Sequence, residues 1–147
     1  MRTLCFNFSE IPIRTYHDIL VLRAAVFVVE QNCVYQDVDE KDPVSMHVIG
    51  LSKENEVIAT ARIVPPGYRY PDVSIGRVVV SKEYRQFGYG KILMEKAIEE
   101  TYRHYGRCPI RISAQAYLEK FYSDLGFTPT GKRYLEDNIP HLEMLLD

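Results

Sequence analysis

Apolar and polar residues recur along the first third of this chain in patterns that predict a strand, a helix and a loop. Alternation predicts a strand over Thr3–Phe8. Apolar residues at helical spacing follow Thr15, and Asp18 three residues later completes the pattern of a helix capping pair. The segment from Glu30 to Pro43 has no period and mixes acidic, polar and aromatic residues. It is typical of a surface loop, which either lies beside a substrate or merely connects two elements.

The rest of the chain predicts six further strands and two helices. The strands are Ser45–Leu51 and Val57–Val64, which pair as a hairpin, then Ser74–Val80, Ile110–Ser113, Phe127–Leu135 and His141–Leu146. One helix runs from Gly88 to Tyr105, and a shorter one covers Tyr117–Leu125. A glycine follows each helix, as is common where helices end. No repeat or linker interrupts the pattern, which predicts a single domain over residues 1–147.

Composition and charge narrow the classes of protein that this pattern fits. The chain has 147 residues, of which 46% are hydrophobic, enough to bury a core. With a net charge of −2, the chain does not have the excess of basic residues that forms the broad basic surface of a nucleic-acid binder. Residues 1–10 lack the basic start and apolar run of a signal peptide, and no stretch is apolar enough to cross a bilayer. We therefore expect a cytoplasmic protein with no nucleic-acid or membrane partner.

No spacing in the chain predicts a metal site. The three cysteines are far apart, without the paired spacing of a zinc site or a disulfide framework. The acidic run from Asp37 to Asp42, followed by His47, lacks the glycine and the closing glutamate of a calcium loop. We therefore expect no metal.

The junction between the strand Ser74–Val80 and the helix after it is suited to an anion. The first N–H groups of a helix have no partner within the helix, and the helix dipole places positive charge there. Gly88 and Gly90 would let a pyrophosphate approach the backbone, and Arg85 and Lys91 add positive charge. Glycines are common in turns, so this feature alone is a weak signal.

Two motifs give this junction a family resemblance. Arg85-x-x-Gly88-x-Gly90, after a valine-rich strand, resembles the acyl-coenzyme A signature of the GNAT N-acetyltransferase superfamily. The run Phe121 to Phe127 is similar to the Phe-Tyr-x-x-x-Gly-Phe element of that superfamily, at its usual distance downstream. Val26 to Gln31, with the acidic loop behind it, resembles the ElaA-like branch. Ile139 to Met144 is similar to that branch and to the end of glyphosate N-acetyltransferases.

The resemblance implies a fold and a ligand. The fold would be α+β, of the three-layer α/β type: a mixed, twisted β-sheet flanked by helices and splayed between its fourth and fifth strands. Acetyl-CoA would fill this gap as co-substrate. Its pantetheine arm would pair with the backbone of Val78 and Val80, and its thioester carbonyl would be polarised near Val78 or Val79. The resemblance implies that the co-substrate contacts Val78, Val79, Val80, Arg85, Gln86, Phe87, Gly88, Tyr89, Gly90, Lys91 and Gln115. Gln115 stands where many family members have asparagine.

Direct acetyl transfer to a primary amine of a small molecule or peptide needs a proton donor and a base. Tyr122 is our candidate to protonate the departing thiolate, because a phenol carries a proton at neutral pH; packing alone is the alternative role. His141 is the first candidate to deprotonate the amine, because imidazole titrates near neutrality and because of the motif around it. Glu30 is the second candidate.

Two other functions stay open, and so do the roles of four arginines. A non-catalytic acyl-CoA sensor would keep Arg85 and both glycines without turnover. An autoinducer-synthase-like acyl transfer is suggested by the Arg-x-x-Val-Phe run that starts at Arg23. Four arginines are candidates either to hold an acidic acceptor or to serve structure: Arg14, Arg23, Arg62 and Arg77. The sequence does not identify the acceptor, and a homodimer stays open.

Overall fold

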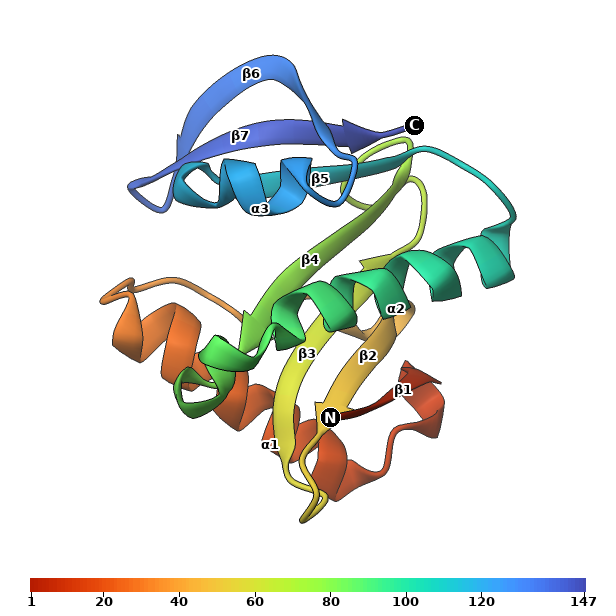
Figure 1. Ribbon diagram of the computed structural model, residues 1–147, viewed down its shortest axis with the longest axis vertical. Helices are drawn as coiled ribbons and strands as arrows, with labels where there is room; N and C mark the ends of the chain where they lie inside the picture. The colour runs from red at the N-terminus through yellow and green to blue at the C-terminus, as the bar shows by residue number, and fades with distance from the viewer.

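Seven strands form one mixed sheet in the computed structural model, which describes residues 1–147 (Figure 1). The strands are β1 (Arg2–Asn7), β2 (Met46–Leu51), β3 (Val57–Val64), β4 (Val73–Val80), β5 (Ile110–Gln115), β6 (Thr128–Glu136) and β7 (Ile139–Leu146). The α-helices are α1 (Ile13–Arg23), α2 (Tyr89–Tyr105) and α3 (Glu119–Ser123). A π-helical segment, η2 (Ala24–Glu30), continues α1, and short 3-10 turns are η1 (Phe8–Glu10), η3 (Asp42–Val44), η4 (Lys82–Phe87) and η5 (Ala116–Leu118).

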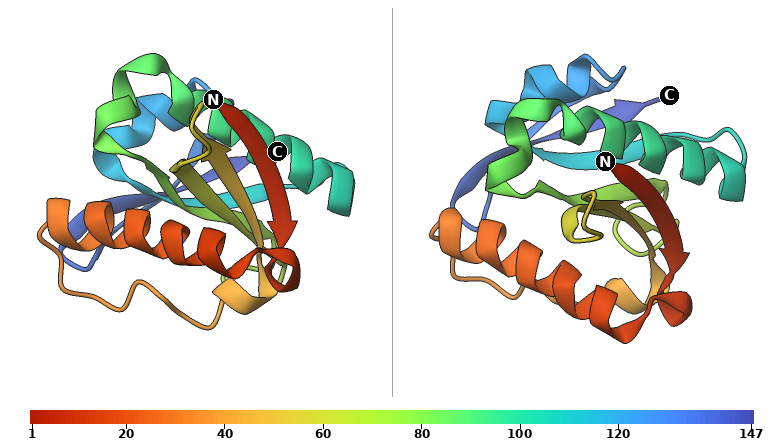
Figure 2. Two further views of the ribbon diagram at one scale, coloured as in Figure 1. Left: turned by 90° about the horizontal axis from the view of Figure 1, so that it is seen from below. Right: turned by 60° about the horizontal axis from the view of Figure 1, so that its bottom comes forward.

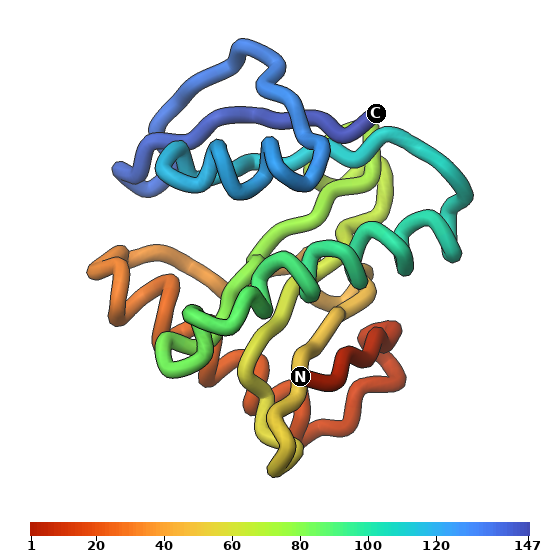
Figure 3. The backbone as a smooth tube through the Cα atoms, viewed as in Figure 1, coloured from red at the N-terminus to blue at the C-terminus, as the bar shows by residue number.

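The sheet opens between β4 and β5. Its strand order is β1-β2-β3-β4-β5-β7-β6, and every neighbouring pair is antiparallel except β4 and β5. These two parallel strands pair only at Val73 with Ile110 and at Ser74 with Arg111. Beyond Ser74 they separate, as the diverging paths of β4 and β5 show in Figures 1 and 3. The predicted α+β fold and its splay are confirmed.

Helices on both faces of the sheet explain why its central strands are so apolar. Helices α1 and α2 lie on opposite sides of the sheet (Figure 2), and both contact β3. Every residue of β3 after Val57 is buried, as expected for a strand that is covered on both faces. From α2, Leu93, Met94 and Ala97 pack into the main core, which includes Ile63 and Ile75.

The exposure of strand β4 changes along its length, and a β-bulge lies where the sheet opens. Thr60 pairs with Val79 and Arg62 pairs with Gly76, so β4 carries an extra residue there, a β-bulge. Arg77 in this bulge has a φ of 51°, in the left-handed region that non-glycine residues rarely adopt. The first three residues of β4 are buried, whereas Gly76 to Val78 are partly exposed. The prediction of a buried central strand therefore holds for only part of β4.

One local prediction was wrong, and another holds only in part. Helix α1 begins at Ile13 after Pro12, so Thr15 lies inside the helix and does not cap it. Pro12 is compatible with this start because an N-terminal N–H has no helical partner in any case. The predicted helix Tyr117–Leu125 is instead the 3-10 turn η5 followed by the short α3, and the chain leaves it through Gly126 at a φ of 100°.

No helix of the structure combines the length and the apolar character needed to cross a bilayer. No group of three or more histidine, cysteine, aspartate or glutamate side chains is placed to hold a metal ion.

Candidate functional site

A cavity of about 960 Å³ occupies the opening between β4 and β5. Helical segment η2, helix α3 and the β6–β7 hairpin contribute to its walls. Of the predicted site residues, it is lined by Val78, Val79, Val80, Arg85, Gly88, Gly90, Lys91, Gln115, Tyr122 and His141. Gln86, Phe87 and Tyr89 do not line it. The fold thus brings most of the predicted residues together around one space.

The backbone edge of β4 offers hydrogen bonds to a ligand in this cavity. On one side β4 pairs with β3 as far as Val80, but on the other its pairing with β5 ends at Ser74. The edge at Val78 to Val80 therefore has no strand partner, and all three residues line the cavity. An extended molecule with amide groups can add to such an edge as a strand would.

The turn before α2 is suited to a phosphate. Gly88 has a φ of 73°, and a Cβ added there would meet nothing within 4 Å, so the backbone is open to a ligand. No side chain caps the 17-residue helix α2, which leaves its first N–H groups available to an anion. Gly90 has a packing role, because a Cβ there would lie 3.4 Å from the Phe121 ring. It lets α2 approach α3 closely.

Aromatic packing explains why two predicted residues lie outside the cavity. Phe87 and Tyr89 pack against each other with ring centroids 5.5 Å apart, and Tyr84 stacks on Tyr89 at 6.2 Å. Their backbone N–H groups still belong to the turn, whereas their side chains support it from outside.

Arg85 forms an ion pair with Glu30, and this pair bears on the predicted role of each residue. The guanidinium donates to both carboxylate oxygens of Glu30, at 2.7 and 2.9 Å, and its Nε donates to the Val80 carbonyl at 3.1 Å. The hydrogen bond from Arg85 lowers the pKa of Glu30. A carboxylate with a lowered pKa and both oxygens engaged is a poor proton acceptor. Glu30 is therefore poorly placed as the base, and Arg85 connects η2 to the turn.

Gln115 takes part in a contact that sequence reasoning missed. Its side-chain amide and that of Gln31 donate to each other, at 3.1 and 3.2 Å, and both residues line the cavity. The pair joins the residue after η2 to the end of β5 across the opening. The two residues are 84 positions apart, so no local sequence signal predicts this contact.

Tyr122 brings a protonated phenol to the cavity. It lies in α3 with its ring edge-on to Phe121 and Phe127, at 5.0 and 5.9 Å between centroids. Burial, with a smaller effect of Tyr117, raises its pKa, so the hydroxyl keeps its proton at neutral pH. No group of the chain forms a hydrogen bond with this hydroxyl, and Tyr122 lines the cavity. The phenol is therefore free to donate to a ligand.

His141 is held in one orientation near the start of β7. Its Nδ1 lies 2.7 Å from the Ile139 carbonyl, and its ring stacks on Tyr134. A carbonyl only accepts hydrogen bonds, so Nδ1 carries the proton of the neutral ring and Nε2 is left as the basic nitrogen. Nε2 lies 3.5 Å from Oε2 of Glu136, a cavity residue that the sequence analysis did not single out.

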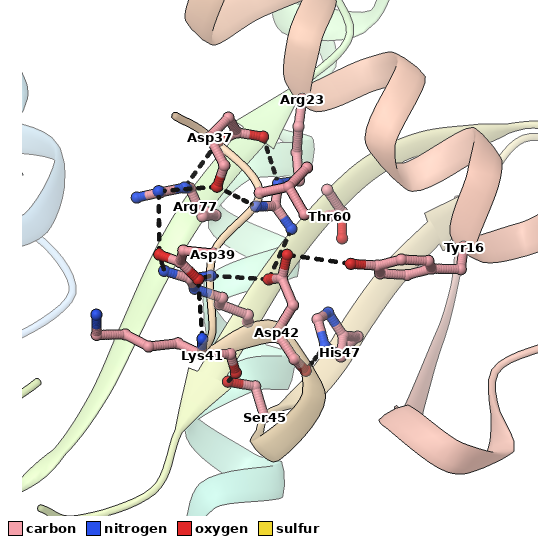
Figure 4. Close-up of polar contacts among 12 residues, drawn as sticks. Tyr16, Arg23, Asp37, Asp39, Lys41, Asp42, Ser45, His47, Thr60 and Arg77 are labelled. Carbon is pink, nitrogen blue, oxygen red and sulfur yellow. Dashed lines mark hydrogen bonds and ion pairs between the residues drawn. The ribbon is translucent and has the colours of Figure 1, made fainter. Parts of the chain in front are cut away.

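A network of charges, buried except at Asp39 and Arg77, fixes the acidic loop (Figure 4). Arg23 binds Asp37 and Asp42, both at 2.9 Å, and Arg62 binds Asp42 at 2.7 Å. The further pairs of the network are Arg62 with Asp39 and Arg77 with Asp37 and Asp39. Three arginines thus neutralise three aspartates.

The network determines how the acidic loop is held and what three of the four candidate arginines bind. Asp37 and Asp42 are buried, so the predicted surface loop is in fact tied to the body of the protein. Arg23, Arg62 and Arg77 are committed to these aspartates, which favours a structural role over the binding of an acidic acceptor. Arg14 lies on the exposed side of α1 and pairs with Asp18.

Comparisons with known proteins agree with this geometry. A family model described as an acetyltransferase (GNAT) domain matches residues 18–147. The chain is 42% identical to protein ElaA of Escherichia coli K12 over 138 residues, which cover 92% of this chain and 90% of ElaA. The crystal structure of E. coli ElaA matches with a TM-score of 0.92, 38% identity and 99% coverage of each chain. That of an acyl-CoA N-acyltransferase from Pseudomonas aeruginosa matches with a TM-score of 0.92, 35% identity and full coverage of both.

More distant structures share the fold alone. TofI matches with a TM-score of 0.83 but 15% identity, and the acyl-homoserine lactone synthase BjaI with 0.75 and 18%. The fold and the site together define an N-acyltransferase that takes an acyl-CoA as co-substrate. The chain belongs to the GNAT acetyltransferase family, and its relatives place it in the ElaA-like branch.

Proposed function

We propose that this protein transfers the acetyl group of acetyl-CoA directly to a primary amine of a small molecule or peptide. The observation that carries the proposal is the single cavity in which the open edge of β4, the glycine turn, Tyr122 and His141 meet. The open edge suits the amides of a pantetheine arm, and the turn at Gly88 suits a pyrophosphate.

The chain's own residues can supply the proton transfers of this reaction. Neutral His141 takes a proton at Nε2 from the acceptor ammonium, because its Nδ1 is already a donor to Ile139. The free amine then attacks the thioester carbonyl, and a carbon–nitrogen bond forms. As the carbon–sulfur bond breaks, the Tyr122 hydroxyl donates its proton to the thiolate. It later regains one from the protonated amide nitrogen through solvent, and the His141 imidazolium releases its proton to solvent. After the amine attacks and before the carbon–sulfur bond breaks, the former carbonyl oxygen carries a negative charge. N–H groups near the β4 bulge at Val78 stabilise this oxyanion.

The first test is binding of acetyl-CoA to the folded protein. At 100 times its dissociation constant a ligand stabilises the native state by about 2.7 kcal/mol, which a thermal shift detects. Gly88→Val is expected to abolish this shift, because a branched side chain would occupy the space beside the turn. Gly131→Val is the matched control, since Gly131 also has a positive φ and open surroundings but lies outside the cavity. Equal shifts in the two folded variants would refute the assignment of the turn.

The second test concerns the base. The kcat/KM for the amine is expected to show a limb that rises with pH, because only the neutral His141 can accept a proton. Glu136 and Tyr134 are the titratable groups that contact its ring. His141→Ala should lose most activity together with this limb while acetyl-CoA binding stays intact. Acceptors of different pKa separate the limb from ionisation of the amine itself, and a limb that persists in active His141→Ala enzyme would place the base elsewhere.

Release of free thiol separates this enzyme from the two alternatives. A non-catalytic sensor would bind acetyl-CoA without releasing thiol in the presence of any amine. An enzyme of the autoinducer-synthase type would release thiol with an adenosylmethionine-like acceptor and not with simple primary amines. Thiol release with primary amines, together with a mass gain of one acetyl group on the acceptor, is the result that we expect.

A further inference from the structure

The geometry points to Glu136 as the residue that selects the acceptor: its carboxylate binds the amine as an ammonium ion beside His141. This inference rests on the proposed acetyl transfer and names the chemical class of its acceptor, an amine that is cationic at neutral pH. Glu136 ends β6, Ser113 comes from β5 and His141 from β7, so three strands bring their side chains together at one wall of the cavity.

Glu136 differs from the other carboxylates that line the cavity. Glu30 has both oxygens bound by Arg85, and Asp39 has both bound by Arg62. Asp137 lines the cavity at the hairpin turn, but its side chain contacts no ionisable partner in the chain. Of these four carboxylates, only that of Glu136 is both held in one orientation and placed with an oxygen facing Nε2 of His141.

The two oxygens of Glu136 have different surroundings. Arg69 donates to Oε1 at 3.0 Å and so orients the carboxylate from the loop between β3 and β4. Oε2 lies 3.3 Å from the Ser113 hydroxyl and 3.5 Å from Nε2 of His141. In neutral His141, Nε2 carries no hydrogen to donate to Oε2, because the proton is on Nδ1. A donor placed between Oε2 and Nε2 would satisfy both acceptors.

An ammonium group meets this requirement. One N–H donates to Oε2 of Glu136 in a charge-assisted hydrogen bond, and a second points to Nε2 of His141. Transfer of that second proton gives a neutral amine and an imidazolium whose new Nε2–H faces Glu136. The nitrogen keeps its electron pair for attack on the thioester, and no further reactant is needed. A neutral alcohol of the same shape lacks both the charge and the additional proton.

The test compares two glutamates, Glu136 and Glu119, which each pair with an arginine at 3.0 Å and are exposed to nearly the same extent. Glu136→Gln keeps the size of the side chain and removes its charge, and it is expected to raise the KM for a primary amine at least about tenfold with the KM for acetyl-CoA unchanged. Glu119→Gln is the matched control and should leave both constants within about twofold, because Glu119 starts α3, pairs with Arg133 and does not line the cavity. An equal rise in both variants, or none in Glu136→Gln, would overturn the inference and leave the proposed function standing.

A binding measurement makes the inference testable without turnover. In protein saturated with coenzyme A, the imidazole nitrogen signals of His141 are followed by NMR during titration with methylammonium, butylammonium and benzylammonium chloride. We expect shifts in the native protein and in Glu119→Gln, and none in Glu136→Gln or with benzyl alcohol. Shifts without thiol release would keep the ammonium site and exclude the acetyl transfer. The absence of a shift with all three ammonium ions in the native protein would overturn the inference.

Discussion

Replacing Arg23 by methionine is expected to lower the free energy of unfolding by about 3 to 5 kcal/mol. Arg23 is 1% exposed and binds Asp37 and Asp42, which are buried with it. Removing its charge leaves Asp42 with one cationic partner, Arg62, and weakens the hold on the loop. A change of this size is a large part of the free energy of unfolding of a typical domain, which is roughly 5 to 15 kcal/mol. Urea denaturation followed by circular dichroism measures it.

The matched control lies on the same helix. Arg14→Met removes the same side chain from an exposed pair with Asp18, where 84% of the Arg14 side chain is accessible. Solvent-exposed pairs contribute roughly 0 to 1 kcal/mol, so the urea midpoint of this variant should stay close to that of the native protein. If Arg23→Met were as mild as Arg14→Met, the network would not contribute to stability in the way that its burial implies.

The same network predicts how stability depends on acid. Burial alone would raise the pKa of Asp39 and Asp42, but the hydrogen bonds and positive charges of the arginines, Arg62 at Asp39 and Arg23 with Arg62 at Asp42, together outweigh it. The pKa of Asp39 falls to about 2 and that of Asp42 is also lowered. A lowered pKa stabilises the folded state above the ordinary value near 4, and this contribution is lost as the pH falls from about 4 toward 2. Urea midpoints at pH 7, 4 and 3 should decline in that order.

Replacing Tyr122 by phenylalanine is expected to lower kcat by about a hundredfold or more while acetyl-CoA still binds. The change removes one hydroxyl, keeps the ring and its packing against Phe121 and Phe127, and breaks no hydrogen bond within the chain. A loss of kcat therefore reports the missing proton donor and not a disturbed core. Steady-state kinetics with saturating amine, together with the acetyl-CoA thermal shift, measure the two effects separately.

Tyr102→Phe is the control for this experiment. Tyr102 also packs against the main core, but it lies on α2 and does not line the cavity. Its variant should turn over at nearly the native rate. Native kcat in Tyr122→Phe would mean that Tyr122 only packs and that water protonates the thiolate.

The sequence by itself determined the parts of this protein that depend on neighbouring residues. Alternation and helical spacing predicted the strands and helix α2, because side-chain direction repeats with the backbone period. The turn at Gly88 was visible because a left-handed backbone at a helix start favours glycine, and the Phe121–Tyr122 element because it follows at a characteristic distance. These local features were enough to indicate the family.

The tertiary structure alone decided which charged and polar side chains meet. The pairs Glu30 with Arg85 and Gln31 with Gln115 join residues 55 and 84 positions apart. Glu136 came beside His141 only because β6 and β7 pair in one register, in which Glu136 opposes Ile139. The free energy of such contacts depends on burial and on distance in space, and a linear pattern carries neither quantity. For the same reason the sequence left the roles of Glu30 and of the arginines open, and the packed fold distinguished them.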